Sequence, residues 1–506
     1  MNRTRLLTLL FLAGCAGAPP PSATPKGAPP PALLPPAPAP APDPLAEAPT
    51  AGIRTTTPFP AIVHRQLTSG LGLAVVPRRG FPVIELRLLV FSGLAADGAL
   101  PGLAAVTGKL LKDGGAGRFS SRELAERTEA LGARLSVSTD RDATRIGLGV
   151  TTGSLDQALE ILDAVAEKPR FSPTEFDKLR QREVDRVKDR ARTSPSWLAS
   201  MVLYRELYAL PVSIHPYAHY DALPEEMSAI KLTDVKRWYK DHFTPDNAVL
   251  VVTGDVDADT VEKAAERAFK TWRGKKTPPP SFSDPRGPNG RRIIVVDRPG
   301  SAQSQVLVGA LGPERRSEEY PALMTANQIL GGGLSGRLFL DVREKRSLAY
   351  STSSWVEEPA RGPMPLVLSA GTQTPRTAEA VAALLEHYDR MSTTAPANEE
   401  LDRATRFLSD SFAFKMETAG AIADLTSRLL VLGLPDETYD DYRRAVRGLD
   451  VETVARSASH AYRQGSLVVV VAGDAQVVAK SLTRFGLVEV LDPEHGFTVQ
   501  KTLPRE

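Results

Sequence analysis

Val249-Leu-Val-Val-Thr-Gly-Asp255 is an apolar run that ends in Gly-Asp, and the run returns near the C-terminus as Val468-Val-Val-Val-Ala-Gly-Asp474. A buried strand closed by Gly-Asp is common, so the surroundings of the two runs decide their meaning. Each run is preceded by two amphipathic helical stretches in the same order, at 155–166 and 176–187 in the first half and at 381–388 and 401–408 in the second. The shared order indicates that the chain contains an internal repeat.

Strand patterns stand beside these helical stretches. Residues 84–90 alternate apolar Ile84, Leu86, Leu88 and Val90 with more polar neighbours, which is typical of a strand with one buried face. Because strands and helices come in separate blocks within each half, the sequence predicts two homologous α+β domains. Each domain is expected to be an antiparallel-rich sheet covered by helices.

Composition marks the ends of these domains. Residues 17–57 are dominated by Pro and Ala, and a second Pro-rich stretch falls at 274–291. Such segments cannot bury a core and are typical of tethers and linkers. We therefore predict a signal peptide at 1–14, a tether at 15–58, an N-terminal domain at 59–273, a linker at 274–291, a C-terminal domain at 292–490 and a tail at 491–506.

Charge and length exclude one class of function. The chain has 506 residues, and its 62 basic and 60 acidic residues give a formal net charge of +2. The basic residues are scattered, which argues against nucleic-acid binding. The chain has ample material for two packed domains, and its one cysteine excludes an intrachain disulfide.

The single cysteine closes a short export signal. Arg3 and Arg5 precede an apolar run, and Leu12-Ala13-Gly14-Cys15 ends it. The run is too short to cross a bilayer, whereas the small residues suit cleavage. The pattern resembles that of bacterial lipoproteins, in which Cys15 would be acylated, and Ala16 resembles the outer-membrane export pattern of diderm bacteria. A plain secretory signal with a chance cysteine is the alternative.

Several segments in order resemble the pitrilysin (insulinase-like) zinc-peptidase family, on its mitochondrial-processing-peptidase-like branch. Gly102-Leu-Ala-Ala-Val-Thr-Gly-Lys-Leu-Leu-Lys-Asp-Gly114 is similar to the family's inverted zinc motif, Gly-Leu-Ala-His-x-x-Glu-His-Met-Leu-Phe-x-Gly. Phe243-Thr-Pro-Asp-Asn247 and Asp297-Arg-Pro-Gly300 match further family segments. The strongest match is Gly331-Gly-Gly-Leu-Ser-Gly-Arg-Leu-Phe339 followed by Arg343 to Ser351. The resemblance implies two domains that form half of a clam-shaped chamber.

The metal positions of the motif are degenerate. The family's two histidines and catalytic glutamate fall on Ala105, Lys109 and Gly108. Alanine and glycine offer no metal donor, and lysine places a cation where the divalent ion would sit. The distal glutamate ligand falls near Arg186, with Glu183 as the alternative register. The resemblance therefore implies no catalytic residue and no zinc in this chain.

Histidines elsewhere do not replace the motif. Among the seven histidines, only His215 and His219 have a spacing of four, and Pro216 interrupts their segment. We interpret both as loop histidines. His387 adjoins an apolar helix face and is interpreted as a residue at the helix surface or core edge.

In two-subunit members of the family, one partner brings the zinc and the other brings an Arg and a Tyr that hold the substrate; these match Arg343 and Tyr350. Arg can donate several hydrogen bonds to a carbonyl or carboxylate, and a Tyr hydroxyl can stabilise an oxyanion. A helix-surface Arg and a core Tyr are the alternative. The glycines Gly331, Gly332 and Gly333 resemble a flexible loop near that site, with a helix end and turn as the alternative.

The leading functional hypothesis is a lipid-anchored, non-catalytic subunit of a two-subunit zinc-dependent endopeptidase. It would hold a peptide or protein substrate, and a paralogous partner with His-x-x-Glu-His would supply zinc. Acylated Cys15 would attach it to the outer membrane, facing the periplasm or the surface. A scaffold protein of the same fold is the first alternative, and an autonomous metallopeptidase with an unrecognised site is the second.

Overall fold

The computed structural model describes residues 57–210, 215–275, 290–463 and 466–506, together with 278, 283–285, 287 and 288. The predicted signal peptide, Cys15 and nearly all of the tether lie outside the described residues, as does part of the predicted linker. All described residues belong to one compact unit. Within them, no helix has both the length and the apolar character needed to cross a membrane.

The strands of the described residues form two sheets. The first sheet has the strands β1 (Val63–Gln66), β2 (Gly72–Pro77), β3 (Val83–Val90), β4 (Ser136–Thr139), β5 (Thr144–Thr151) and β6 (Ala248–Gly254). The second has β7 (Arg291–Asp297), β8 (Gln303–Glu314), β9 (Ser351–Val356), β10 (Pro363–Gln373), β11 (Leu467–Gly473), β12 (Val488–Asp492) and β13 (Thr498–Leu503). Their orders are β1-β2-β6-β3-β5-β4 and β13-β12-β7-β11-β8-β10-β9.

The two Gly-Asp runs occupy the same place in the two sheets. β6 pairs in parallel with β2 and antiparallel with β3, and β11 pairs in parallel with β7 and antiparallel with β8. Every residue of β11 is buried, and so is every residue of β6 except Val249. A central strand with both faces covered needs such a continuous apolar run. The internal similarity of the sequence is therefore a similarity of topology.

Helices cover both sheets. In the first half they are α1 (Leu103–Asp113), α2 (Ser121–Ala130), α3 (Leu155–Glu167), α4 (Pro173–Thr193), α5 (Pro195–Leu207), α6 (Pro224–Ala229), α7 (Leu232–His242) and α8 (Ala258–Ala268). In the second half they are α9 (Tyr320–Gly331), α10 (Thr377–Thr393), α11 (Asn398–Asp410), α12 (Ala419–Leu432), α13 (Thr438–Arg447), α14 (Val451–Ala461) and α15 (Ala475–Leu482). Short helical turns join them, among them η3 (Pro216–Ala218) and η5 (Leu338–Lys345).

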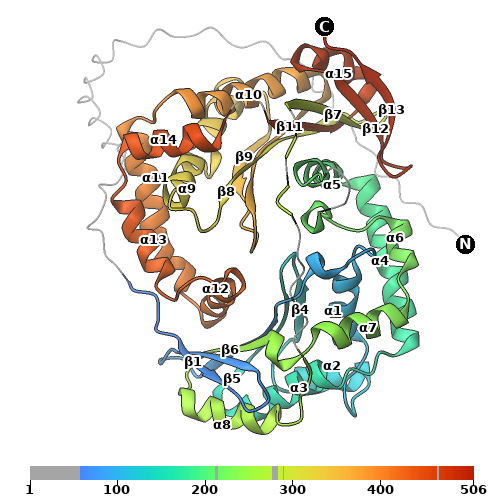
Figure 1. Cartoon of the computed structure of the whole chain (residues 1–506), viewed down its shortest axis with the longest axis vertical. Coiled ribbons are helices and arrows are strands. Elements are labelled where there is room, and N and C mark those ends of the chain that lie inside the picture. The colour runs from blue at the N-terminus through green and yellow to red at the C-terminus, as the bar shows by residue number, and fades with distance from the viewer. Residues whose placement is uncertain are drawn as a thin grey trace, which may run out of the picture. The chain divides into compact units, whose positions relative to one another are not determined.

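The two halves exchange one helix each. α5, from the first half, packs on β8 and β11 of the second sheet, and α12, from the second half, packs on β3 and β6 of the first (Figure 1). Gly309 in β8 allows the close approach of α5, because a Cβ there would lie 2.7 Å from Leu203 Cδ1. Arg87 in β3 bonds Asp424 in α12 at 3.1 Å. Each sheet therefore completes its core with a helix of the other half.

The predicted fold class is confirmed, since the structure is a mixed α+β fold with two sheets covered by helices. The segment predicted as a tail covers residues 491–506. Its residues include the end of β12 and all of β13, which pair antiparallel at the edge of the second sheet. The side chains of β13 are almost all exposed, so the sequence carries no buried alternation that would have revealed this strand.

Candidate functional site

The helix that carries the degenerate motif begins at a buried carboxylate. Asp97 accepts hydrogen bonds from the backbone N–H groups of Gly102 and Ala104, both at 2.7 Å. An acid at this end of α1 satisfies N–H groups that the helix leaves without partners and faces the positive end of its dipole. Burial raises the pKa of Asp97 to about 7, although these hydrogen bonds act to lower it. These hydrogen bonds from Gly102 and Ala104 to Asp97 fix the start of α1.

The three degenerate positions differ in what surrounds them. Ala105 and Lys109 lie one turn apart on a half-exposed face of α1, whereas Gly108 is buried against β4. A Cβ at Gly108 would lie 2.8 Å from Thr139 Oγ1 and 3.2 Å from Val137 Cγ1. A glutamate side chain at this position therefore does not fit unless β4 moves.

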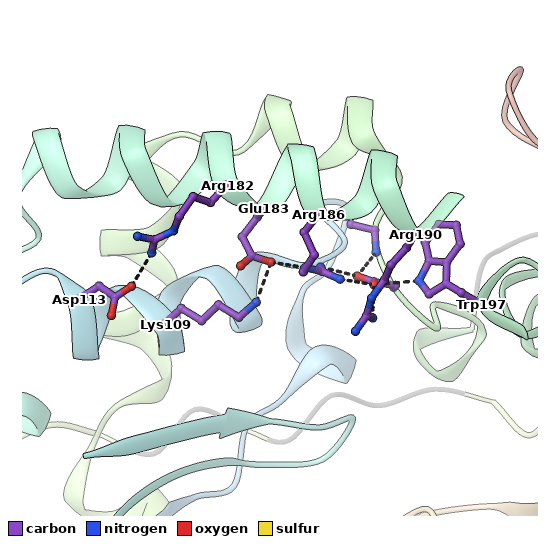
Figure 2. Close-up of polar contacts among 9 residues, drawn as sticks. Lys109, Asp113, Arg182, Glu183, Arg186, Arg190 and Trp197 are labelled. Atoms are coloured by element: carbon purple, nitrogen blue, oxygen red, sulfur yellow. Dashed lines mark hydrogen bonds and ion pairs between the residues drawn. The ribbon is translucent and has the colours of Figure 1, made fainter. Parts of the chain in front are cut away.

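Lys109 faces the long helix α4 (Figure 2). Its Nζ lies 2.6 Å from Oε2 of Glu183, and the same oxygen accepts a 2.6 Å hydrogen bond from Nε of Arg186. Glu183, Arg186 and Arg190 share one face of α4, since they are separated by three and four residues. Arg182, the residue before Glu183, donates a hydrogen bond of 2.6 Å to Asp113 of α1.

The contacts continue to a loop residue, Asp221, that follows η3. Its Oδ2 accepts from Arg186 Nη1 and from Trp197 Nε1, both at 3.0 Å, while Oδ1 accepts from Arg186 Nη2 at 3.3 Å and from the Ala222 N–H at 2.9 Å. Arg190 Nη1 lies 3.6 Å from the same carboxylate. We call Lys109, Glu183, Arg186, Asp221 and Arg190 the ion-pair network.

Neighbouring charges keep the acids of this network ionised. Burial acts to raise the pKa of Glu183, but the hydrogen bonds and charges of Lys109 and Arg186 outweigh it and lower that pKa. Burial likewise opposes the ionised form of Asp221, and Arg186 together with Trp197 lowers its pKa. The network therefore pairs its own charges at the positions that the sequence resemblance matches to the zinc motif.

The residues at this place do not fit zinc. Ala105 and Gly108 have no donor atom, and the Lys109 ammonium is occupied as a hydrogen-bond donor to Glu183. Across the described parts of the chain, no three His, Cys, Asp or Glu residues are grouped so that they could hold a metal ion. The donor set is that of a salt-bridged structural cluster.

A cavity of about 340 Å³ opens beside the network. Ala105 and Lys109 of α1 form one wall, and Arg186 and Arg190 of α4 form another. Val137, Ser138, Thr139, His219, Tyr220 and Asp221 complete most of the lining. β4 is the edge strand of the first sheet, so unpaired backbone groups border the cavity.

Arg343 and Tyr350 lie together in the second half. Arg343 belongs to η5, a π-helical segment, and its guanidinium carbon lies 5.7 Å from the Tyr350 ring centroid and 4.7 Å from that of Phe339. Tyr350 is 85% exposed, which excludes the alternative of a core tyrosine. Its backbone N–H is bonded to Gly371, but in the described residues no hydrogen bond reaches its hydroxyl. π-helical segments are frequent at functional sites.

The glycines before this pair end a helix. Gly331 is the last residue of α9, and Gly332 is its C-cap. A Cβ on Gly331 would lie 2.8 Å from both Leu338 Cδ1 and the Ser354 backbone N, so close packing requires glycine there. The predicted flexibility of Gly331–Gly333 stays a prediction.

Sequence reasoning missed several residues around the degenerate motif. Asp221, Arg190 and Asp97 were not singled out, and His219 was interpreted only as a loop residue. Burial lowers the pKa of His219, which favours its neutral form. Glu183 and Arg186, the two candidate registers for the distal glutamate, both belong to the network, and the register stays a prediction.

Comparison with known proteins places both halves in one family. Residues 83–209 match the family described as Insulinase (Peptidase family M16), and residues 229–408 match the family described as Peptidase M16 inactive domain. Together the two matches cover most of the described chain.

Individual relatives agree with these matches. An uncharacterized zinc protease of Streptomyces coelicolor is 27% identical over 46% of this chain, and the match spans only 52% of that relative. Zinc protease PqqE of Helicobacter pylori is 25% identical over 65% of this chain and 73% of its own length. The crystal structure of a peptidase M16 inactive domain from Pseudomonas fluorescens superposes with a TM-score of 0.76, at 24% identity, over 82% of this chain and 98% of that one, which shows the fold.

Proposed function

Because this chain belongs to peptidase family M16, we propose that it acts as the non-catalytic, substrate-holding subunit of a two-subunit zinc-dependent endopeptidase. The main support for this proposal is a contrast between the two halves of the chain. The positions matched to the metal ligands hold an ion-pair network, while the half-exposed Arg343 lies beside the exposed Tyr350. Zinc would then come from a paralogous partner with an intact His-x-x-Glu-His motif.

The exposed pair suits a peptide in its chemistry. The Arg343 guanidinium can donate paired hydrogen bonds to a carbonyl, and the Tyr350 hydroxyl can donate to an oxygen that gains negative charge during attack. Arg343 has one acidic neighbour, Glu344, at 3.6 Å, so most of its donors remain available. The edge strand β4 adds backbone groups with which an extended peptide can pair.

The proposal includes attachment to a membrane through an acylated Cys15. The lipobox and the Pro/Ala-rich segment that follows it support this, since a long tether would hold the folded part away from the bilayer. Metabolic labelling with a radioactive fatty acid tests it, because the native chain should be labelled and a Cys15→Ser variant should not. Cell fractionation then distinguishes the outer membrane from the inner one.

Co-purification tests the subunit role. The tagged chain would be recovered from its native membrane and examined by mass spectrometry, metal analysis and a peptide-cleavage assay. The proposal expects a paralogue with His-x-x-Glu-His, one zinc per pair, and cleavage that falls on Arg343→Ala. A partner without cleavage would favour the scaffold alternative, and chelator-sensitive cleavage by the isolated chain would favour an autonomous peptidase.

A further inference from the structure

The cavity beside the ion-pair network is lined by the cations Lys109, Arg186 and Arg190 and by the acid Asp221, and its cations are more exposed than its acids. The side chains of Lys109 and Arg190 are 39% and 51% exposed, whereas those of Glu183 and Asp221 are only 10% and 16% exposed. Glu183 does not line the cavity at all, although both of its cationic partners do. An incoming group therefore meets ammonium and guanidinium donors first.

Arg190 and Lys109 have N–H donors that make no hydrogen bond within the described residues. Both oxygens of Asp221 already accept two hydrogen bonds each, from Arg186, Trp197 and the Ala222 backbone. The Arg190 guanidinium, at 3.6 Å from Asp221, lies beyond hydrogen-bond distance, and its side chain makes no other ion pair or hydrogen bond within the described residues. Lys109 uses one of its three donors on Glu183.

We propose that this cavity binds a carboxylate group of a peptide, through Arg190 and Lys109. A carboxylate offers two acceptor oxygens that match the fork of an arginine. It would come from the C-terminus of a peptide or from an Asp or Glu side chain close to the segment that pairs with β4. That the carboxylate belongs to a peptide rests on the proposed function, whereas the anion preference rests on the cavity alone.

Two further groups in the cavity are compatible with an anion. His219 contributes a polar ring whose neutral form is favoured by burial. Asp97 also lines the cavity, but both of its oxygens are bonded to backbone N–H groups at the start of α1. Neither group competes with the exposed donors of Arg190 and Lys109.

The test compares three acetylated peptides on the full-length chain by ligand-detected NMR titration. Ac-Ala-Ala-Ala with a free C-terminus carries a terminal carboxylate, Ac-Ala-Glu-Ala-NH₂ carries a side-chain carboxylate, and Ac-Ala-Ala-Ala-NH₂ is neutral. At least one acidic peptide should bind about tenfold more tightly than the neutral one, as hydrogen bonds between charged groups imply. The preferred acidic peptide identifies the source of the carboxylate.

Variants locate the binding. Arg190→Gln should weaken the preferred acidic peptide about tenfold and leave the neutral peptide unchanged. Arg192→Gln is the matched control, because Arg192 lies on the same helix, is 81% exposed and does not line this cavity, and it should change neither. Since the Arg190 side chain makes one ion-pair contact, at 3.6 Å, within the described residues, its replacement should leave the fold intact.

Equal binding of acidic and neutral peptides, or an acidic preference that survives Arg190→Gln, would overturn the proposal. These outcomes are independent of co-purification. Carboxylate binding without a zinc-bearing partner would reject the proposed subunit role alone, and an active pair without any carboxylate preference would reject only this inference.

Discussion

The two regions predicted from the resemblance as site residues differ in how their polar groups are satisfied. In the first half, Lys109, Glu183, Arg186 and Asp221 are joined by contacts of 2.6, 2.6 and 3.0 Å, and the acids are largely buried. In the second half, Tyr350 is 85% exposed and Arg343 has a single acidic neighbour at 3.6 Å. The acids of the first region are held in internal contacts, so these contacts contribute mainly to stability.

This difference indicates which side chains are accessible to a ligand and which are held by partners within the protein. A buried charge stays in place only if its partners are present, and removal of one partner leaves the others unsatisfied. An exposed tyrosine hydroxyl that has no hydrogen-bond partner among the described residues contributes little to stability, so the Tyr350 hydroxyl is accessible to a ligand. Mutations in the two regions should therefore affect different measurements.

Asp221→Ala should give the largest effect, on stability. It leaves Arg186 and the Trp197 N–H without their acceptor, and loss of one partner of a largely buried pair costs about 3–5 kcal/mol. Chemical denaturation measures it. Asp189→Ala, which removes an exposed acid on α4, should stay within about 0.5 kcal/mol. Equal effects of the two would remove the distinction between the regions.

Arg343→Ala and Tyr350→Phe should show the reverse pattern. Each should leave the free energy of unfolding within about 0.5 kcal/mol of the native chain, because Tyr350 is exposed and Arg343 is half-exposed. Each should lower cleavage by the complex about 10²-fold, as expected for loss of a donor to a developing oxyanion. Arg456→Ala, at an exposed pair on α14, is the control for a lost surface arginine. Unchanged cleavage would support the scaffold alternative.

Much of the fold was predictable because its strands and helices follow from local patterns of apolar residues in the sequence. The buried runs that became β6 and β11 and the helical spacing at 155–166 and 381–388 identify the repeated α+β architecture. The exchange of α5 and α12 was not predictable, since an amphipathic helix carries no mark of which sheet it will cover.

The loss of the metal ligands was also predictable from the sequence, because Ala105, Gly108 and Lys109 lie within one helix. The ion-pair network at these positions was not predictable. Asp221 lies in a loop without periodicity, and its contact with Arg186 spans 35 positions of the sequence. The register between Glu183 and Arg186 stayed open in the sequence, because helix spacing alone places both near α1. Long-range partners of this kind require the three-dimensional structure.

Asp97 gives the first region a pH dependence. Burial raises its pKa to about 7, whereas the ordinary value is near 4, so between these values the folded chain binds more protons than the unfolded chain. Its contribution to stability therefore falls as pH rises from about 4 to 7, by at most about 1.4 kcal/mol per pH unit. Asp97→Asn should flatten this slope in denaturation measured at pH 5, 6 and 7. An unchanged slope would show that Asp97 is ionised throughout.

Gly108→Ala tests the smallest effect, the close packing of the degenerate motif. Alanine favours a helix over glycine by about 1 kcal/mol, but a Cβ here would press on Thr139 and Val137, and overpacking costs about 1–3 kcal/mol. We expect a net loss of about 1 kcal/mol in denaturation. Gly420→Ala in α12 is the matched control, since its nearest neighbour would lie at 3.6 Å, and it should stabilise the chain. If both substitutions stabilise the chain, β4 adjusts at little cost and position 108 can accept a larger side chain.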